Sequence, residues 1–166
     1  NYYYLTVMNE NYIHPKRPSA ATNTAIMKGA YKYKNAKKPH VRILASGLTL
    51  RFALSAEGIL SKMNINAEIW SITSFNELAR EGTATEQEKL YENNKKESYV
   101  EKCFGTLMPT IAVSDYQKLY AEQIRRWIKG TYVCLGTDGF GRSDTREKLR
   151  SFFEIDAQHI VFNALK

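Results

Sequence analysis

The stretch VCLGTDGFGRSDTRE, residues 133–147, decides the fold class of this chain. It starts with an apolar run over 133–135, continues through a turn with three glycines, and then predicts a helix over 144–153. A strand that runs through a glycine-rich turn into a helix is the connection found at one edge of an open α/β sheet. The stretch therefore favours a sheet of mostly parallel strands with helices between them.

The turn in this stretch is the first candidate site. Glycine permits a positive φ or the close approach of another chain segment. Ser143 or Asp144 is a candidate N-cap of the helix, and Glu147 completes a capping box behind Asp144. We predict that the turn is a structural and interface site, with the candidate residues Gly136, Asp138, Gly139, Phe140, Gly141, Arg142, Ser143 and Asp144.

A phosphate site is the alternative role for this turn, because backbone N–H groups at a helix N-terminus attract anions. The glycine order G-x-x-G-x-G differs from the dinucleotide fingerprint and from the Walker loop, and no lysine follows the glycines. The carboxylates of Asp138 and Asp144 would repel an anion at this place. The sequence therefore favours the structural role over phosphate binding.

The same alternation of strands and helices recurs along the chain. Apolar or alternating runs predict strands over 2–9, 31–34, 41–47, 66–74, 110–114 and 132–136. Helical spacing and capping residues predict helices over 20–27, 48–62, 75–80, 116–128, 144–153 and, in the tail, 155–166. Strands that alternate with helices through short turns imply a mostly parallel sheet covered on both faces.

Local features of the helices lead to further expectations. Gly58 is expected to allow close packing on the sheet, and Gly82 to end the short helix over 75–80. The polar run over 83–105 indicates a solvated helix or a surface loop that serves as a connection and not as a site. The helix over 116–128, with Asp115 as its cap, is expected to bury one apolar stripe in the core, formed by Tyr116, Leu119, Tyr120, Ile124, Trp127 and Ile128.

The composition is that of a soluble globular protein. The chain has 166 residues, of which 43% are hydrophobic and 25% are charged, and no apolar run approaches the ~20 residues that cross a membrane. Two distant cysteines, Cys103 and Cys134, indicate reduced thiols and a cytoplasmic location. The chain begins with Asn1, without a Met or a leader, so we expect residues 1–166 to be one domain of a longer polypeptide.

Much of the net charge of +7 lies in the segment 28–40, where lysines alternate with tyrosines. Such a pattern fits nucleic-acid binding, since lysines neutralise phosphates and aromatic rings stack on bases. It also fits an edge strand whose lysines point outward and block further pairing. The edge strand is the favoured interpretation, and specific nucleic-acid binding is not expected.

The usual chemistry of an active site is missing from the sequence. The three histidines, at 14, 40 and 159, stand alone without a carboxylate or cysteine at metal-ligand spacing. No G-x-S-x-G, H-E-x-x-H or C-x-x-C motif occurs. Ser114 and Ser143 lack a base nearby in the sequence. We expect no catalytic, cofactor-binding or metal-binding residue in this chain.

Four separated motifs carry a resemblance to a known family. They are NENY at 9–12, SITSFNELAREG at 71–82, SDY at 114–116, and LGTDGFGRSD at 135–144 followed by RE at 146–147 and LR at 149–150. In this order they strongly resemble the C-terminal domain of the homodimeric pyruvate dehydrogenase decarboxylating components, which are transketolase-like thiamine diphosphate enzymes. The resemblance extends over most of the chain.

The resemblance implies an α/β fold with three layers, built on an open, mostly parallel sheet of about five strands with one antiparallel edge strand. It implies the C-terminal third of a homodimeric oxidoreductase that decarboxylates pyruvate and acetylates the lipoyl group of a dihydrolipoyl acyltransferase. In that family the thiamine diphosphate and Mg²⁺ lie between the two preceding domains. The third domain packs on the middle domain and contributes to the subunit interface, so the segment alone is expected to be inactive.

The chain departs from the family in two places. At 86–94 the family has a Glu-Arg-aromatic-Asn run ending in His-Pro, whereas this chain reads EQEKLYENN. The family also continues for some tens of residues beyond the position of Lys166, so the resemblance leads us to expect that the extreme C-terminus is missing. A free-standing basic module that binds an anionic ligand or nucleic acid stays open as the alternative function.

Overall fold

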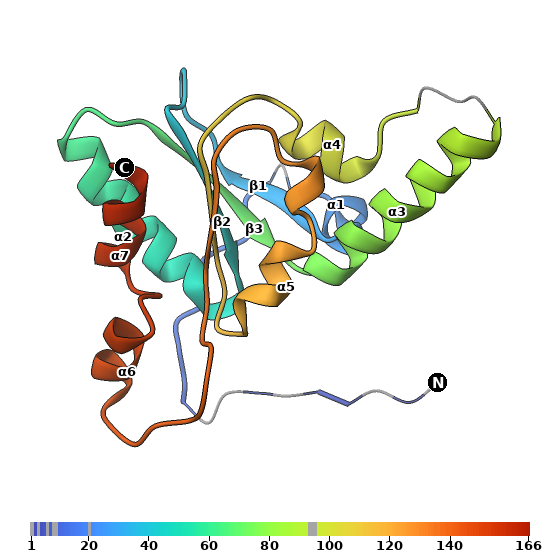
Figure 1. The fold of residues 1–166 in the computed structure, drawn as a ribbon. Coiled ribbons are helices and arrows are strands. Elements are labelled where there is room, and N and C mark those ends of the chain that lie inside the picture. Colours follow the sequence, from blue (N-terminus) through green and yellow to red (C-terminus); the bar gives the residue numbers. More distant parts are fainter. Residues whose placement is uncertain (1, 3, 6, 8–9, 20, 93–95) are drawn as a thin grey trace.

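The computed structural model describes residues 2, 4, 5, 7, 10–19, 21–92 and 96–166. Its centre is a five-stranded sheet in the order β1-β3-β2-β4-β5 (Figure 1). The strands are β1 (Ala30–Lys34), β2 (Val41–Ser46), β3 (Ala67–Ile72), β4 (Thr110–Val113) and β5 (Tyr132–Leu135). β1 is antiparallel to β3, and the pairs β2/β3, β2/β4 and β4/β5 are parallel. The expected sheet with one antiparallel edge strand is confirmed.

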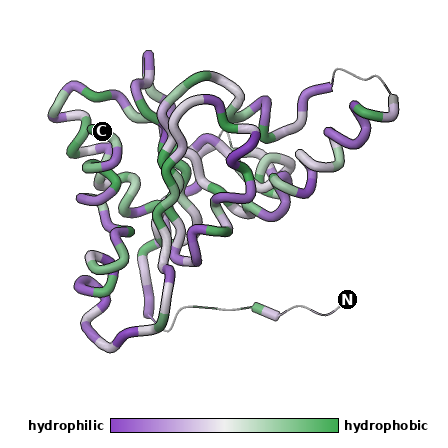
Figure 2. Tube along the Cα trace, viewed as in Figure 1, coloured by the Kyte–Doolittle hydropathy of each residue, from purple (hydrophilic) through white to green (hydrophobic). Residues whose placement is uncertain are grey.

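Helices cover both faces of this sheet, as Figure 1 shows. The helices are α1 (Asn23–Met27), α2 (Leu50–Lys62), α3 (Phe75–Glu92), α4 (Tyr99–Phe104), α5 (Lys118–Glu122), α6 (Arg146–Phe152) and α7 (Ala157–Ala164). α2 and α7 pack on one face, while α3, α4 and α5 lie over the other. The central strands β2 and β3 are buried along almost their whole length and are mostly apolar (Figure 2), because a parallel sheet with two covered faces has no solvent side.

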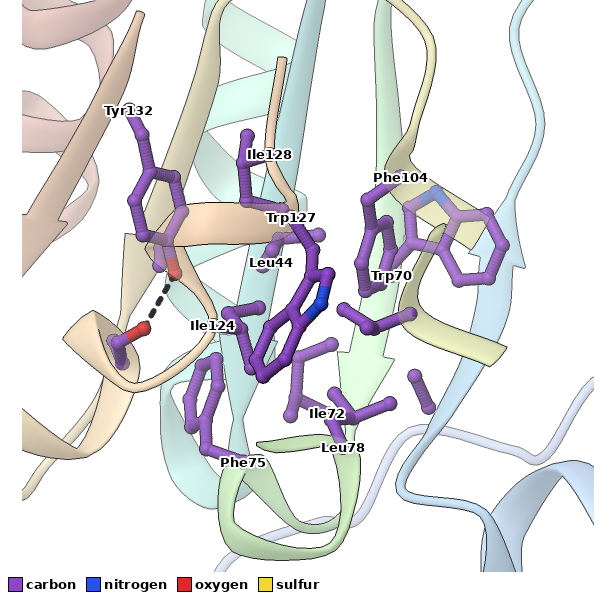
Figure 3. Close-up of a cluster of buried hydrophobic side chains, with 14 of the residues drawn as sticks. Leu44, Trp70, Ile72, Phe75, Leu78, Phe104, Ile124, Trp127, Ile128 and Tyr132 are labelled. Atoms are coloured by element: carbon purple, nitrogen blue, oxygen red, sulfur yellow. Dashed lines mark hydrogen bonds between the residues drawn. The ribbon is translucent and has the colours of Figure 1, made fainter. Parts of the chain in front are cut away.

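The core on the face of α3, α4 and α5 is built around Trp127 (Figure 3). A Cβ on Gly82 would lie 2.6 Å from a ring carbon of Trp127, so only a glycine lets the indole approach α3 this closely. α3 continues through Gly82 to Glu92. The expectation that Gly82 ends this helix is therefore wrong: the glycine serves packing rather than termination.

The segment 83–105 is more than a solvated connection. Its last part forms α4, which begins at a capping box made by Ser98 and Glu101. Val100 and Phe104 of α4 are fully buried, and the Phe104 ring meets Trp70 edge-on with 4.9 Å between ring centroids. This polar segment therefore contains a short helix whose two buried apolar side chains are four positions apart, on one face of the helix.

The predicted helix over 116–128 is interrupted. α5 ends at Glu122, and a 3₁₀ turn follows over Arg125–Trp127. The carbonyl of Ala121 accepts a hydrogen bond from the Tyr132 hydroxyl at 2.8 Å (Figure 3), whereas in a continuing α-helix it would accept from the N–H of Arg125. Only the second half of the apolar stripe is buried, namely Ile124, Trp127 and Ile128.

The first half of that stripe, on α5 and in the turn before it, faces solvent. The exposed fractions are 53% for Tyr116, 69% for Leu119 and 41% for Tyr120. The expectation that these three residues belong to the core is wrong, because α5 and the turn before it leave these side chains exposed and only Ala121 of α5 is buried.

Two further expectations are corrected. Gly58 of α2 is exposed and a Cβ there would meet nothing within 4 Å, and Ala53, Ala56 and Leu60 make the packing surface instead. The strand predicted over 2–9 is not formed by its described residues, which are exposed and outside any strand: Tyr2, Tyr4, Leu5 and Val7. Residues 1, 3, 6, 8 and 9 of that prediction lie outside the described residues. The sheet edge beside β3 is taken by β1.

Candidate functional site

The turn after β5 lies at the carboxyl edge of the parallel strands, next to the starts of α5 and α6 (Figure 1). The chain crosses from β3, on one side of β2, to β4 on the other side. Open α/β sheets bind ligands at the carboxyl edge beside such a reversal of strand order. The turn residues are therefore placed where a functional surface is expected.

Gly136 and Asp138 attach the turn to the start of α5. A Cβ on Gly136 would lie 2.5 Å from the Tyr116 carbonyl oxygen and 2.8 Å from the Lys118 nitrogen, so this position requires glycine. Asp138 Oδ1 accepts a hydrogen bond from the Lys118 N–H at 3.0 Å, which is the first N–H of α5. The Thr137 N–H donates to the Tyr116 carbonyl at 2.9 Å. Asp138 thus caps α5, the role expected of Asp115.

The other two glycines of the turn differ from Gly136. Gly139 has a φ of +91°, the backbone region that favours glycine. Gly141 has no such φ, and a Cβ there would meet open space. Gly136 is therefore required by its close neighbours, and Gly139 is favoured by its positive φ. Neither reason applies to Gly141, so the expected conformational need for glycine does not hold there.

Phe140 and Arg142 form the outer part of the turn. The Phe140 side chain is 95% exposed, an unusual state for a large apolar ring. The Arg142 guanidinium lies 4.0 Å from the centroid of the Phe152 ring on α6, and that ring meets Phe153 edge-on. The turn presents aromatic surface to the outside and holds α6 through a cation–π contact.

The cap of α6 is one residue later than predicted. The Thr145 side chain accepts from the Lys148 N–H, and α6 begins at Arg146. Asp144 Oδ1 instead accepts from the neighbouring Thr145 N–H at 2.7 Å, and Ser143 is exposed. The capping box predicted for Asp144 and Glu147 is not formed, because the irregular turn extends to residue 145.

The carboxylates of the turn do not fit a diphosphate–metal group. Asp138 is bonded to Lys118 of its own chain, and Asp144 to Thr145. No group of His, Cys, Asp and Glu side chains that could hold a metal ion occurs within the described residues. We therefore derive no chemistry through such a group at this turn.

A hollow of about 190 Å³ lies between the ends of β4 and β5 and the helix α6. Asp115, Arg146 and Arg150 supply its charged side chains, and Leu149 and Phe153 supply apolar walls. Desolvation raises the pKa of the Asp115 carboxyl, although the positive charges of Arg150 and Arg146 act in the opposite direction.

The basic segment over 28–40 uses its central lysines inside the fold. Lys32 Nζ lies 2.8 Å from Glu68 Oε2, and Lys34 Nζ lies 2.7 Å from Glu57 Oε2. Lys32 also stands 5.0 Å from the Trp70 ring centroid. Because these lysines of β1 already form ion pairs within the chain, they fit the edge-strand interpretation better than a nucleic-acid groove.

The remaining candidate residues, His159 and the two cysteines, have surroundings that fit a structural role. His159 Nδ1 lies 2.8 Å from Asp156, the N-cap of α7. Cys103 and Cys134 are free thiols, and burial raises the pKa of Cys134 to about 12, which leaves it unreactive. No described helix combines the length and the apolar character that a membrane crossing requires.

Comparison with known proteins agrees with this architecture. The family model of the transketolase-like TK C-terminal domain matches residues 29–156, from the start of β1 to the cap of α7. This chain belongs to the transketolase-like C-terminal domain family. The match includes every strand of the sheet and the whole glycine turn.

Curated relatives of this transketolase-like domain are pyruvate dehydrogenase E1 components. The identity is 49% for the protein of Pseudomonas aeruginosa, 46% for that of Cupriavidus necator and 41% for that of Escherichia coli. Each alignment covers 99% of the chain, and the chain spans about a fifth of these relatives, 20%, 19% and 19% respectively.

Solved transketolases share the fold of this domain. One from Pichia stipitis superposes with a TM-score of 0.61 at 17% identity, over 88% of this chain and 19% of the transketolase. One from Leishmania mexicana gives a TM-score of 0.60 at 20% identity, over 89% of this chain and 19% of its own. The strand order with one antiparallel edge is thus the transketolase C-terminal arrangement.

Proposed function

We propose that residues 1–166 form the C-terminal structural and interface domain of a pyruvate dehydrogenase E1 component. The observation that supports the proposal most is the 49% identity to such a component over 99% of the chain. The whole enzyme would decarboxylate pyruvate oxidatively and pass the acetyl group to the lipoyl group of its acyltransferase. This domain would supply no catalytic residue.

The exposed apolar side chains around the glycine turn support the interface role. We name this surface the α5 patch: Tyr116, Leu119, Tyr120 and Phe140. The rings of Tyr116 and Tyr120 lie 5.1 Å apart, and the Asp138 cap ties the turn to the same helix. Exposed apolar clusters of this kind mark protein interaction sites, and we propose that the α5 patch packs at the dimer interface.

The cofactors would be held elsewhere in the whole enzyme. Thiamine diphosphate and Mg²⁺ would lie on the other domains, since the carboxylates of the turn here are engaged within their own chain. The free thiols fit a cytoplasmic enzyme. The partners would be a second copy of the enzyme and the dihydrolipoyl acyltransferase core.

Two measurements test this function. The 166-residue chain should neither decarboxylate pyruvate nor bind thiamine diphosphate in calorimetry, and measured binding would contradict the proposal. In the whole enzyme, Leu119→Glu should shift the sedimentation profile toward the monomer. Leu90→Glu is the matched control, because Leu90 is 81% exposed on α3, away from the α5 patch. Equal dimer content in both variants would remove the interface role.

A further inference from the structure

Three arginines meet beside the carboxyl ends of β2, β4 and β5. We call them the arginine cluster: Arg51 of α2, with Arg146 and Arg150 of α6. Arg146 and Arg150 are four residues apart and share a face of their helix. Arg51 and Arg150 both stand over the ring of Tyr12, at 4.9 and 5.6 Å from its centroid. Two helices far apart in the sequence thus direct positive charge at one place.

A short piece of the N-terminal segment occupies the arginine cluster. Arg146 Nε lies 3.0 Å from Glu10 Oε2, and Arg150 Nη2 donates to the Tyr12 hydroxyl at 2.7 Å. The Tyr12 hydroxyl donates to the Glu10 carboxylate. That hydrogen bond lowers the pKa of Glu10, desolvation opposes it, and the charges of all three arginines lower the pKa further. The cluster therefore already receives one carboxylate.

Carboxylates besides Glu10 also lie near the arginine cluster. Asp115, just after β4, faces Arg146 and Arg150, and Glu147 and Asp156 line the surface beside Arg150. A second hollow, of about 290 Å³, adjoins the cluster and is lined by Glu10, Tyr12, Leu48 and Arg51. Guanidinium groups bind phosphate through paired N–H donors, and the cluster lies at the sheet edge where open α/β folds take ligands.

We propose that the arginine cluster is a binding site for a phosphate monoester dianion, and that Glu10 is its competitor within the chain. The Glu10–Arg146 pair is about two-fifths exposed on both sides, and exposed ion pairs contribute little to stability. A dianion that contacts all three arginines displaces this single carboxylate. Binding then releases Tyr12 and the segment around it from α2 and α6.

The experiment titrates the 166-residue chain with phenyl phosphate and with inorganic phosphate in calorimetry, against chloride at matched ionic strength. Glu10→Gln removes the competitor and should bind at least about tenfold more tightly than the unmodified chain. Arg150→Gln and Arg146→Gln should each lose binding. Arg80→Gln is the matched control, because Arg80 is an exposed arginine paired with Glu77 on α3. Thermal melts verify that each variant is folded.

A second measurement follows the release of Tyr12. Phenyl phosphate should accelerate chymotryptic cleavage after Tyr12, measured by mass spectrometry as fragments that begin at Ile13, and chloride should not. Tighter binding of phenyl phosphate than of inorganic phosphate identifies an organic monoester, and equal binding identifies the free ion. The proposal is overturned if no variant binds, if Glu10→Gln binds no more tightly than the unmodified chain, or if folded Arg150→Gln binds as well.

Discussion

Asp138 caps the helix that begins at Lys118, twenty residues earlier in the chain. The bond joins the turn after β5 to the start of α5, which follows β4. Two neighbouring strands therefore share one capping interaction at their carboxyl ends. This relationship places Phe140 and the other residues of the α5 patch on one connected unit.

Removal of this cap should weaken the fold. Asp138→Ala leaves the Lys118 N–H without its acceptor, and loss of an N-cap costs about 0.5–2 kcal/mol. Urea denaturation of the 166-residue chain measures the loss. Ser143→Ala, an exposed serine in the same turn, is the control and should change the free energy of unfolding by less than about 0.5 kcal/mol. Equal effects would show that Asp138 is not a cap.

The glycines of the turn should respond differently to alanine. Gly136→Ala places a Cβ 2.5 Å from the Tyr116 carbonyl oxygen and should destabilise the domain by about 1–3 kcal/mol. Gly139→Ala should cost about 1–3 kcal/mol through its φ of +91°. Gly141→Ala meets open space and should be neutral within about 0.5 kcal/mol. Chemical denaturation of the three variants tests this order, and a cost at Gly141 equal to that at Gly136 would refute it.

Two helical glycines form a second matched pair. Gly82→Ala drives a methyl group into the Trp127 ring, 2.6 Å away, and should lower the free energy of unfolding by about 1–3 kcal/mol. Gly58→Ala has open space inside α2 and should raise it by about 0.5–1 kcal/mol. Melting curves recorded side by side check the opposite signs. A stabilised Gly82→Ala variant would mean that Trp127 does not pack against α3.

The buried pair of Glu68 and Arg42 should make the free energy of unfolding depend on pH in the acidic range. Arg42 Nε lies 2.6 Å from Glu68 Oε1, and both side chains are almost fully buried. Desolvation acts to raise the pKa of Glu68, but hydrogen bonds from Lys32, Arg42 and Trp70 outweigh it and hold the pKa below the ordinary value of 4.5. The ionised carboxylate therefore adds stability above that value, and the gain is lost as the pH falls further.

Glu68→Gln tests this dependence. At pH 7 it leaves Arg42 with a buried, uncompensated charge and should cost about 3–5 kcal/mol. The difference from the unmodified chain should shrink as the pH is lowered from 4.5 toward the lower pKa of folded Glu68. Glu88→Gln is the control, since Glu88 forms an exposed pair with Lys96. A difference that stays constant between pH 6 and 3 would contradict the assignment.

Much of the sheet could be read from the sequence. Apolar runs such as 41–46 and 110–113 form strands because a sheet covered on both faces selects continuous hydrophobic segments. The alternating lysines and tyrosines of β1 indicated an edge strand, and it lies at the edge. These features could be predicted because they depend only on the spacing of apolar and polar residues within each segment.

Two of the wrong predictions have the same cause. Gly82 resembled a helix end, but Trp127 packs against it. Leu119 resembled a core residue of a helix over 116–128, but α5 ends at Glu122, where the Ala121 carbonyl accepts a hydrogen bond from Tyr132. Each outcome depends on a partner far along the chain. No local pattern contains that information.

The sequence by itself determined the five strands of the sheet, most of the helices between them, the glycine turn after β5 and the resemblance to the transketolase-like enzymes, because apolar spacing and motif letters are local properties. Only the tertiary structure decided that Asp138 rather than Asp115 caps α5, and that Arg51, Arg146 and Arg150 surround Glu10. Crossover connections bring the carboxyl ends of parallel strands together, so residues from distant segments acquire common neighbours only after the sheet has formed.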